Sequence, residues 1–321
     1  MFFNKYPNVF LHTGDAAAAL THHFPAAVDI FLLSPPYDTV TEEYKTLLKK
    51  TRQYEEGYTW DFCELANAMW NSLTEGGVII WNIDDRHFHN SETSTPERQK
   101  LYFQDVLGAK VETIIVRQEG VGAKGANDLY WQGFEYIYLF SKGKKLRFNP
   151  IEDKVNSQAG RITSGERPQY NGDKRIAKNR TIPQYSKRTN VWVVSPQPRN
   201  TNGHPAPMDL TLAKDLLYSF ADQGCVICDP MLGSGTSAVA ALEVFGPDVH
   251  FWGIDSSEKY VQAAAQRIEA LELGELYDPN PERPQEKQTV SIRDHFMHPI
   301  DGTQDDLSDL PVQQWVTRGG I

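Results

Sequence analysis

Short apolar runs alternate with stretches of helical periodicity along most of the chain. Uninterrupted apolar runs are typical of strands in a parallel sheet, because helices cover both faces of such a sheet. The predicted strands are 9–14, 28–33, 78–83, 133–142, 225–228 and 249–255, with a glycine-capped helix end at 73–77 and helices at 238–244 and around 260–268. This alternation predicts an α/β fold with a doubly wound, largely parallel sheet, which binds ligands at the carboxyl ends of its strands.

A glycine-rich turn follows the predicted strand at 225–228. It reads Asp229-Pro230-Met231-Leu232-Gly233-Ser234-Gly235-Thr236 and leads into the Ala-rich helix. Glycines let the backbone bend tightly and let a ligand approach without a Cβ in the way. Asp255 ends the next strand and is placed to hold a ribose diol. The pattern therefore predicts a site for a nucleoside-containing cofactor.

Gly233, Gly235, Ala238 and Asp255 also satisfy the dinucleotide fingerprint, so a nicotinamide-dependent oxidoreductase is a competing hypothesis. Against it, Asp229 would place a negative charge near a pyrophosphate, whereas it could accept a hydrogen bond from the ammonium group of an amino-acid cofactor. The absence of a Lys after the glycines excludes a phosphate-binding loop of the nucleotide-hydrolase type.

Ser34-Pro35-Pro36-Tyr37 closes the apolar run 28–33 and suits methylation of the exocyclic amine of a nucleobase. Such an amine is a poor nucleophile because its lone pair is delocalised, so hydrogen-bond acceptors must draw it toward tetrahedral geometry. Because proline fixes φ and extends the residue before it, the Ser34 hydroxyl and the Pro35 carbonyl can converge on one amine. Tyr37 offers a ring for stacking a flipped base. A merely rigid loop is the alternative interpretation.

Together these motifs resemble those of the S-adenosylmethionine-dependent DNA amino-methyltransferases of the beta group, in which the catalytic half precedes the cofactor half. The resemblance covers most of residues 8–270 and implies a Rossmann-like methyltransferase fold with permuted motif order. Ser34 to Tyr37 match the catalytic motif, and Asp229 to Thr236 match the cofactor loop, with Met231 where the family usually has Phe. Asp15 resembles a cofactor-contacting acid, and His204-Pro205 resembles the family's cofactor-side His-Pro motif.

The resemblance implies S-adenosylmethionine as cofactor and double-stranded DNA as partner. Ser at the first motif position goes mostly with N4 of cytosine in this family, while Asp or Asn goes mostly with N6 of adenine. Ser34 therefore favours cytosine, and adenine remains the alternative. The predicted cofactor-binding residues are Asp15, His204, Asp229, Pro230, Met231, Gly233, Ser234, Gly235, Thr236 and Asp255.

The net charge of −10 is unfavourable for a DNA enzyme, because phosphate contacts need Lys and Arg. However, the segment from Lys142 to Arg199 holds fourteen Lys or Arg and only four Asp or Glu. We predict that residues 151–199 form a small basic target-recognition insert that holds phosphates and reads base edges; a solvated basic loop is the alternative. The predicted DNA-binding residues are Arg161, Arg167, Lys174, Arg175, Lys178, Arg180, Lys187 and Arg188.

The predicted organisation has four parts, and 321 residues with 40% hydrophobic side chains suffice for one large core. Residues 1–150 form the catalytic half, 151–199 the insert, 200–270 the cofactor half and 271–321 an acidic, irregular tail broken by prolines. After the catalytic turn, Lys45, Lys49, Lys50, Arg52, Tyr54 and Tyr58 indicate either a flap over the flipped base or an amphipathic helix with a solvated face.

Composition indicates a cytoplasmic protein, and the resemblance implies that it is bacterial or phage-encoded and acts at the nucleoid. No apolar run approaches the roughly 18 residues of a membrane span, the N-terminus lacks a signal-peptide pattern, and three cysteines fit a reducing compartment. A companion restriction endonuclease would share the DNA site without contacting this chain.

Two further groupings resemble metal sites but are better explained otherwise. Cys225 and Cys228 lie in a predicted strand without a second ligand pair, which disfavours zinc. Asp84, Asp85, His87 and His89 are better read as a polar loop, because methyl transfer needs no metal. A DNA-binding regulator that has lost activity would keep the basic insert, but the intact sequence of residues 34–37 argues against it.

Overall fold

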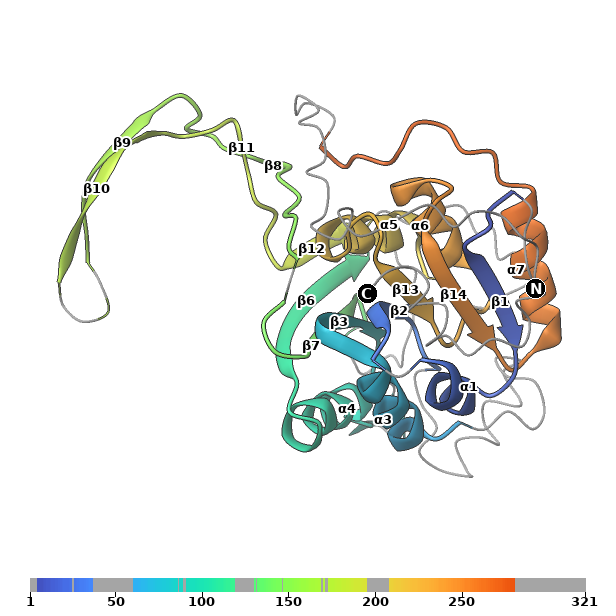
Figure 1. Cartoon of the computed structure of the whole chain (residues 1–321). Helices are drawn as coiled ribbons and strands as arrows, with labels where there is room; N and C mark the ends of the chain where they lie inside the picture. The colour runs from blue at the N-terminus through green and yellow to red at the C-terminus, as the bar shows by residue number, and fades with distance from the viewer. Residues whose placement is uncertain are drawn as a thin grey trace.

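The central element of the computed structural model is one eight-stranded sheet with the order β1-β14-β13-β2-β3-β7-β6-β12 (Figure 1). The structure describes residues 5–24, 26–36, 60–85, 87–88, 91–118, 130, 132–145, 147–168, 170, 173–194 and 208–280. In sheet order, the strands are β1 (Val9–Thr13), β14 (His250–Asp255), β13 (Val226–Asp229), β2 (Val28–Leu33), β3 (Leu73–Ile83), β7 (Phe134–Ser141), β6 (Lys110–Gln118) and β12 (Val191–Val194).

Strands β1, β14, β13, β2 and β3 pair in parallel. Strand β7 is antiparallel to both of its neighbours, β3 and β6, while β12 pairs in parallel with β6. The largely parallel, doubly wound α/β fold that the alternation predicted is confirmed. Because these five strands run in the same direction, their carboxyl ends lie at one edge of the sheet.

Helices cover both faces of the sheet. The helices are α1 (Ala16–His23), α3 (Phe62–Ser72), α4 (Thr95–Leu101), α5 (Leu210–Phe220), α6 (Thr236–Phe245) and α7 (Glu258–Glu269), with a π-helical turn η1 (Tyr102–Val106) after α4. On one face, α5, α6 and α7 pack against strand residues such as Ile30, Leu32 and Ile80. On the other, α1, α3 and η1 pack against Phe31, Leu33 and Trp81. From Ile30 to Leu33, alternate residues of β2 thus belong to two cores.

The predicted helix end at residues 73–77 is wrong. Helix α3 ends at Ser72, and β3 begins immediately at Leu73. The end of α3 is held by Lys142, whose Nζ donates to the carbonyls of Trp70 (2.9 Å) and Leu73 (3.1 Å). A lysine from a distant strand therefore satisfies the last carbonyls, whereas the local sequence pointed to a glycine cap.

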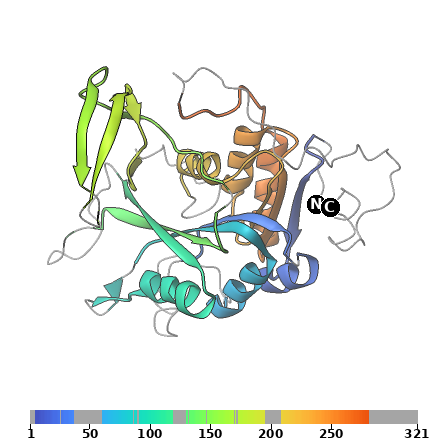
Figure 2. The same cartoon turned by 60° about the vertical axis from the view of Figure 1, so that its left-hand side comes forward.

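Residues 151–168 and 173–188 form a long two-chain ribbon that projects from the body in both views (Figures 1 and 2). Strands β8 (Lys154–Val155) and β11 (Tyr185–Ser186) pair near its base, and β9 (Ile162–Pro168) and β10 (Lys174–Thr181) pair farther out, both antiparallel. The chain then returns to the central sheet as β12, so the predicted insert interval, 151–199, includes one strand of that sheet.

A small hairpin of β4 (His87–Phe88) and β5 (Ser91–Glu92) follows β3. Residues 271–280 continue beyond α7 without helix or strand, and Asn280 is buried. The rest of the predicted tail lies outside the described residues. Within the part of the chain that the structure describes, no helix is long and apolar enough to cross a membrane.

Candidate active site

The Ser34 turn and the glycine turn lie beside each other at one edge of the sheet. Strands β2 and β13 are parallel neighbours, with Ile30 opposite Ile227 and Phe31 opposite Cys228. Because both strands run toward the same edge, the segments that follow them, 34–36 and 230–235, emerge side by side. Pro35 is buried, while Ser34 and Pro36 are half-buried. Two turns that are almost 200 residues apart in sequence thus lie at one edge of the sheet.

Several predicted residues lie outside the described part of the chain. These are Tyr37, His204 and the candidate flap residues Lys45, Lys49, Lys50, Arg52, Tyr54 and Tyr58.

The glycine turn contains two left-handed residues. Gly233 has φ 52°, and Gly235, which precedes α6, has φ 79°. A Cβ on Gly235 would lie 2.8 Å from the Cβ of Ala264 in α7. Gly235 is therefore required twice, by its backbone conformation and by the close approach of the neighbouring helix. The turn is also tied to β14, because Leu232 N donates to the Ile254 carbonyl at 2.9 Å.

Asp255 bonds to the glycine turn with one carboxylate oxygen and to the start of α7 with the other. Oδ2 accepts from the backbone N–H of Gly233 at 2.8 Å, and Oδ1 accepts from Ser257 N at 2.9 Å. The predicted ribose-binding acid is thus at the carboxyl end of β14, as the strand pattern indicated, and it also fixes the position of the glycine backbone.

Asp229, at the end of β13, is buried beneath the same turn. Its Oδ1 accepts from Met231 N at 2.9 Å, and its Oδ2 accepts from the Ser237 hydroxyl. Burial raises the pKa of Asp229 to about 7, the nearby Asp255 charge adds to the increase, and the hydrogen bonds from Ser237 and Met231 oppose it. A carboxyl group with this pKa gains its charge readily when a cation approaches.

Ser234 provides the clearest sign that the turn accommodates a ligand. Its Oγ is buried, and within the described residues it has no hydrogen-bond partner. The flanking atoms are engaged, because Arg267 Nη1 donates to the Ser234 carbonyl (3.3 Å) and to Thr236 Oγ1 (3.1 Å). An orphaned hydroxyl in a fixed glycine turn fits a polar ligand group that would supply the missing partner.

Asp15 lies at the neighbouring strand end. It caps α1, with Oδ1 accepting from Ala18 N at 2.7 Å. The preceding residue, Gly14, donates its N–H to the Asp255 carbonyl at 3.0 Å, which brings Asp15 to the same edge of the sheet. Its exposed side chain therefore lies at the edge that carries the glycine turn.

Sequence reasoning missed Asn82 and Glu135. Asn82 and Ser34 each lie one residue beyond the paired Trp81 and Leu33, at the end of neighbouring parallel strands. Within β3, alternation places Asn82 on the face of Ile80, which belongs to the core cluster that includes Leu32.

Asn82 is buried, its Nδ2 donates to Glu135 Oε2 at 3.2 Å, and its Oδ1 has no hydrogen-bond partner among the described residues. Because a carboxylate only accepts, this bond orients the amide and leaves its oxygen as the open acceptor. A polar residue near the end of an otherwise apolar strand was the available signal.

The predicted DNA-binding residues of the ribbon differ in how far the structure describes their side chains. Arg161, Arg180 and Lys187 are exposed. The backbones of Arg167, Lys174, Arg175 and Lys178 lie in β9 and β10, and their side chains are outside the description.

Arg188 does not fit the prediction of a DNA contact. Its guanidinium is half-buried, is paired with Asp153 and Asp215, and lies over the Trp192 ring at 4.8 Å. Burial alone would lower its pKa, but the two acidic partners raise it overall. We therefore place Arg188 at the base of the ribbon.

Of the two groupings that resemble metal sites, the structure describes the side chains of the two cysteines and the two aspartates, whereas those of His87 and His89 lie outside the description. Cys225 and Cys228 are both buried and belong to core clusters on opposite faces of the sheet. Burial raises the pKa of each thiol. Asp84 and Asp85 bond to Gln132 and Thr93. Among the described residues, no group of three or more His, Cys, Asp or Glu could hold a metal ion.

Comparisons with known proteins extend this description. The DNA methylase family, of the N6/N4 methyltransferase type, matches residues 28–266. The orphan methyltransferase M.BamHII of Bacillus amyloliquefaciens is 30% identical over 251 residues, which cover 75% of this chain and 88% of that protein. The type II methyltransferase M.ScaI of Streptomyces caespitosus is 24% identical over 273 residues, 82% of each protein.

Solved structures agree with the fold. The PvuII DNA methyltransferase (cytosine-N4-specific) superposes with a TM-score of 0.58 at 14% identity, covering 87% of this chain and 93% of that one. A DNA modification methylase from Thermus thermophilus, complexed with S-adenosyl-L-methionine, gives 0.50 at 21% identity, covering 83% and 97%. With the fold shared and the family match spanning most of its length, this chain belongs to the DNA methylase family.

Proposed function

We propose that this DNA methylase transfers a methyl group from S-adenosylmethionine to N4 of a cytosine flipped out of duplex DNA. The observation that carries the proposal is the register of β2 and β13, which brings the Ser34 turn and the glycine turn to one edge of the sheet. A cofactor held by one turn would then face a base held by the other.

S-adenosylmethionine supplies a methyl group on an electrophilic sulfonium, so the protein's task is to hold and orient the two reactants. Gly233, Gly235 and the orphaned Ser234 hydroxyl form the proposed backbone cradle. Asp229 is proposed to accept from the cofactor's ammonium group and Asp255 from its ribose. Asp15, Pro230, Met231, Thr236 and His204 complete the proposed cofactor set.

The target amine is proposed to bind at the Ser34 turn. The Ser34 hydroxyl and the Pro35 carbonyl accept from the amine and draw its lone pair out of conjugation. Tyr37 stacks against the base. Asn82 supports this role, because it lies one residue beyond the Leu33–Trp81 pair, as Ser34 does, and its Oδ1 is an open acceptor. A strong general base is unnecessary, and the amine proton passes to water during or after transfer.

Cytosine is favoured over adenine because Ser at the first position of this motif goes mostly with N4 of cytosine in the family that the motif resembles. A hydroxyl that accepts from the amine and donates to the ring nitrogen beside it would by itself suit either base. Adenine N6 remains the second candidate, because both bases present an amine beside a ring-nitrogen acceptor.

Duplex DNA is proposed to bind along the ribbon, through exposed basic residues that include Arg161, Arg180 and Lys187. The biological role that we propose is DNA protection at the nucleoid of a bacterium or phage. A companion restriction endonuclease would cut the same site when it is unmethylated, without contacting this chain.

Incubation of mixed-sequence duplex DNA with the protein and labelled S-adenosylmethionine, followed by nucleoside mass analysis, tests the proposal. N4-methylcytosine is the expected product. N6-methyladenine would transfer the assignment to the second candidate, and the absence of any labelled nucleoside would overturn the proposed activity. The matched control is Ser34→Ala, which should retain cofactor binding but lose label transfer.

A further inference from the structure

The ribbon joins the body at its base, where its two chains first pair. Arg188 N donates to the Ile151 carbonyl at 2.8 Å, and further backbone bonds continue through β8–β11 and β9–β10 toward the tip. Figures 1 and 2 show the ribbon extending away from the helices and the central sheet. Because a long arm amplifies rotation at its base, groups that hold the base control where the tip lies.

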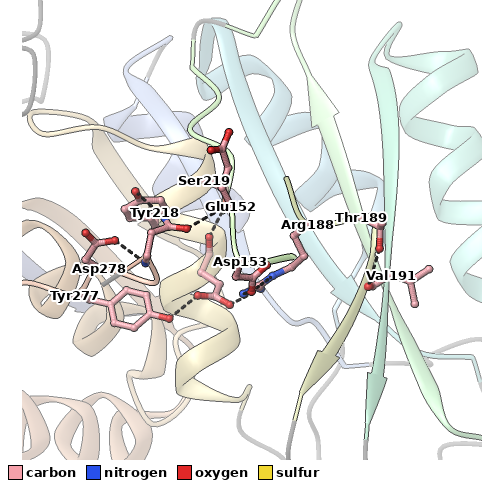
Figure 3. Close-up of polar contacts among 11 residues, drawn as sticks. Glu152, Asp153, Arg188, Thr189, Val191, Tyr218, Ser219, Tyr277 and Asp278 are labelled. Atoms are coloured by element: carbon pink, nitrogen blue, oxygen red, sulfur yellow. Dashed lines mark hydrogen bonds and ion pairs between the residues drawn. The ribbon is translucent and has the colours of Figure 1, made fainter. Parts of the chain in front are cut away.

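Four side chains meet at this base and are here called the root cluster: Asp153, Arg188, Asp215 and Tyr277. Figure 3 labels Asp153, Arg188 and Tyr277. Arg188 Nη2 pairs with Asp153 Oδ2 and its Nη1 pairs with Asp215 Oδ2, both at 2.6 Å. Tyr277 donates its hydroxyl hydrogen to Asp215 Oδ1 at 2.5 Å. The cluster thus joins the ribbon, helix α5 and the segment after α7.

Asp215 is the centre of the root cluster. Its side chain is only 9% exposed, and its two oxygens are bonded to Arg188 and Tyr277. A carboxylate buried to this extent needs such partners, and losing one leaves a poorly solvated charge. The contacts therefore hold Arg188, and with it the ribbon base, in one position on α5.

The segment after α7 makes a second attachment to the ribbon base. Asn280 Oδ1 accepts from Glu152 N at 2.8 Å, and Asn280 Nδ2 donates to the Tyr218 hydroxyl of α5 at 3.2 Å. Asn280 is itself buried. Residues 277–280 therefore bridge the same two elements, the ribbon base and α5, that the Arg188–Asp215 pair joins.

We infer that Arg188 is a positioning residue for target recognition, and that the root cluster, including Tyr277 from beyond the cofactor half, sets the angle at which the ribbon meets DNA. The inference rests on the proposed function, in which the ribbon binds duplex DNA. It adds a requirement that family membership does not supply. Residues 277–280 are needed for productive DNA binding, although they contact the ribbon at its base, far from its tip.

Substitution of Asp215 separates this role from a direct phosphate contact by Arg188. If charge alone mattered, Asp215→Asn would remove a negative charge near the DNA surface and tighten binding. If the cluster positions the ribbon, the same change weakens binding. We expect the KM for duplex DNA to rise about tenfold, with kcat and the Kd for S-adenosylmethionine within about twofold of wild type.

Tyr277→Phe provides an independent test that changes no charge and leaves Arg188 paired. It should raise the KM for DNA about threefold or more, again without affecting cofactor binding, because it removes one bond to a charged group. The control is Asp222→Asn, since Asp222 forms a 2.6 Å ion pair with Arg147 outside the root cluster. That variant should bind DNA as wild type does or slightly more tightly.

Fluorescence anisotropy with a labelled duplex gives the DNA Kd of each variant independently of turnover. If Asp215→Asn fails to fold, Tyr277→Phe decides. Equal DNA affinity for Tyr277→Phe and wild type, or tighter binding by Asp215→Asn, would overturn the positioning role. A wild-type protein that neither binds nor methylates duplex DNA would instead overturn the proposed function.

Discussion

Asn82 Nδ2 donates to Glu135 Oε2 at 3.2 Å, so a glutamate from β7 orients an amide at the end of β3. The amide oxygen that this bond leaves open is buried, and Asn82 lies one residue beyond the Leu33–Trp81 pair, as Ser34 does. The amine's two hydrogens are proposed to go to the Ser34 hydroxyl and the Pro35 carbonyl, and the Asn82 oxygen is a further acceptor that one of these hydrogens can share.

Replacing Asn82 by Ala should therefore lower kcat about tenfold to a hundredfold, because one acceptor that orients the amine is lost. The Kd for S-adenosylmethionine should stay within about twofold of wild type, as measured by calorimetry. Glu135→Gln should give a smaller decrease, since a glutamine amide can still accept. An Asn82→Ala enzyme with normal kcat would remove Asn82 from the base pocket.

Ser34→Ala should lower turnover far more than cofactor affinity. The hydroxyl is proposed to act on the amine, so we expect kcat to fall at least about a hundredfold while the cofactor Kd is unchanged. Single-turnover kinetics with saturating DNA measure the chemical step. Comparable losses in turnover and cofactor affinity would contradict this role.

The titration of Asp229 should appear in cofactor binding. Its pKa is raised to about 7 because the carboxyl group is buried, so ionisation and attraction for a cationic ammonium group increase as pH rises through that value. Affinity for S-adenosylmethionine should accordingly increase from about pH 6 to about pH 8, measured by calorimetry at constant ionic strength. Asp229→Asn should bind more weakly and show a flatter profile over this range.

The same shift has the opposite effect on stability of the free protein. Below the unfolded pKa of 3.8, Asp229 is protonated in both the folded and the unfolded state, so its contribution to folding stability is fully present there. Between 3.8 and about 7 the folded state holds the proton more tightly, so this contribution is lost as pH rises to about 7. Denaturant unfolding of the wild-type protein without cofactor should show this decline in the free energy of unfolding as pH rises to about 7. A free energy that does not decline over this range would contradict the raised pKa.

Gly235→Ala should destabilise the fold by about 2 kcal/mol, combining strain at positive φ with a clash against Ala264. Gly108→Ala is the matched control, because Gly108 has φ 77° but a Cβ there would meet nothing within 4 Å. Gly108→Ala should lower the free energy of unfolding by the backbone strain alone, about 1 kcal/mol. Equal losses in denaturant unfolding would show that helix packing does not constrain Gly235.

Six strands of the central sheet, all but β6 and β12, and the two motifs that follow β2 and β13 could be predicted without coordinates. Uninterrupted apolar runs such as 28–33 mark strands buried on both faces, and Gly235 marks a positive φ, because these signals are local. The end of α3 was mispredicted because its cap, Lys142, comes from a strand about 70 residues away.

Which polar residues meet could not be predicted, because long-range packing sets it. Nothing local distinguishes Arg188, held by Asp153 and Asp215, from the exposed Arg180 on the same ribbon. Likewise, Asn82 is a candidate site residue because the register of β3 against β2 places it near the end of both strands, and its oxygen has no partner among the described residues. This register is set by long-range strand pairing. A side chain's type follows from the sequence, but its partners depend on which distant strands and helices the folded chain brings together.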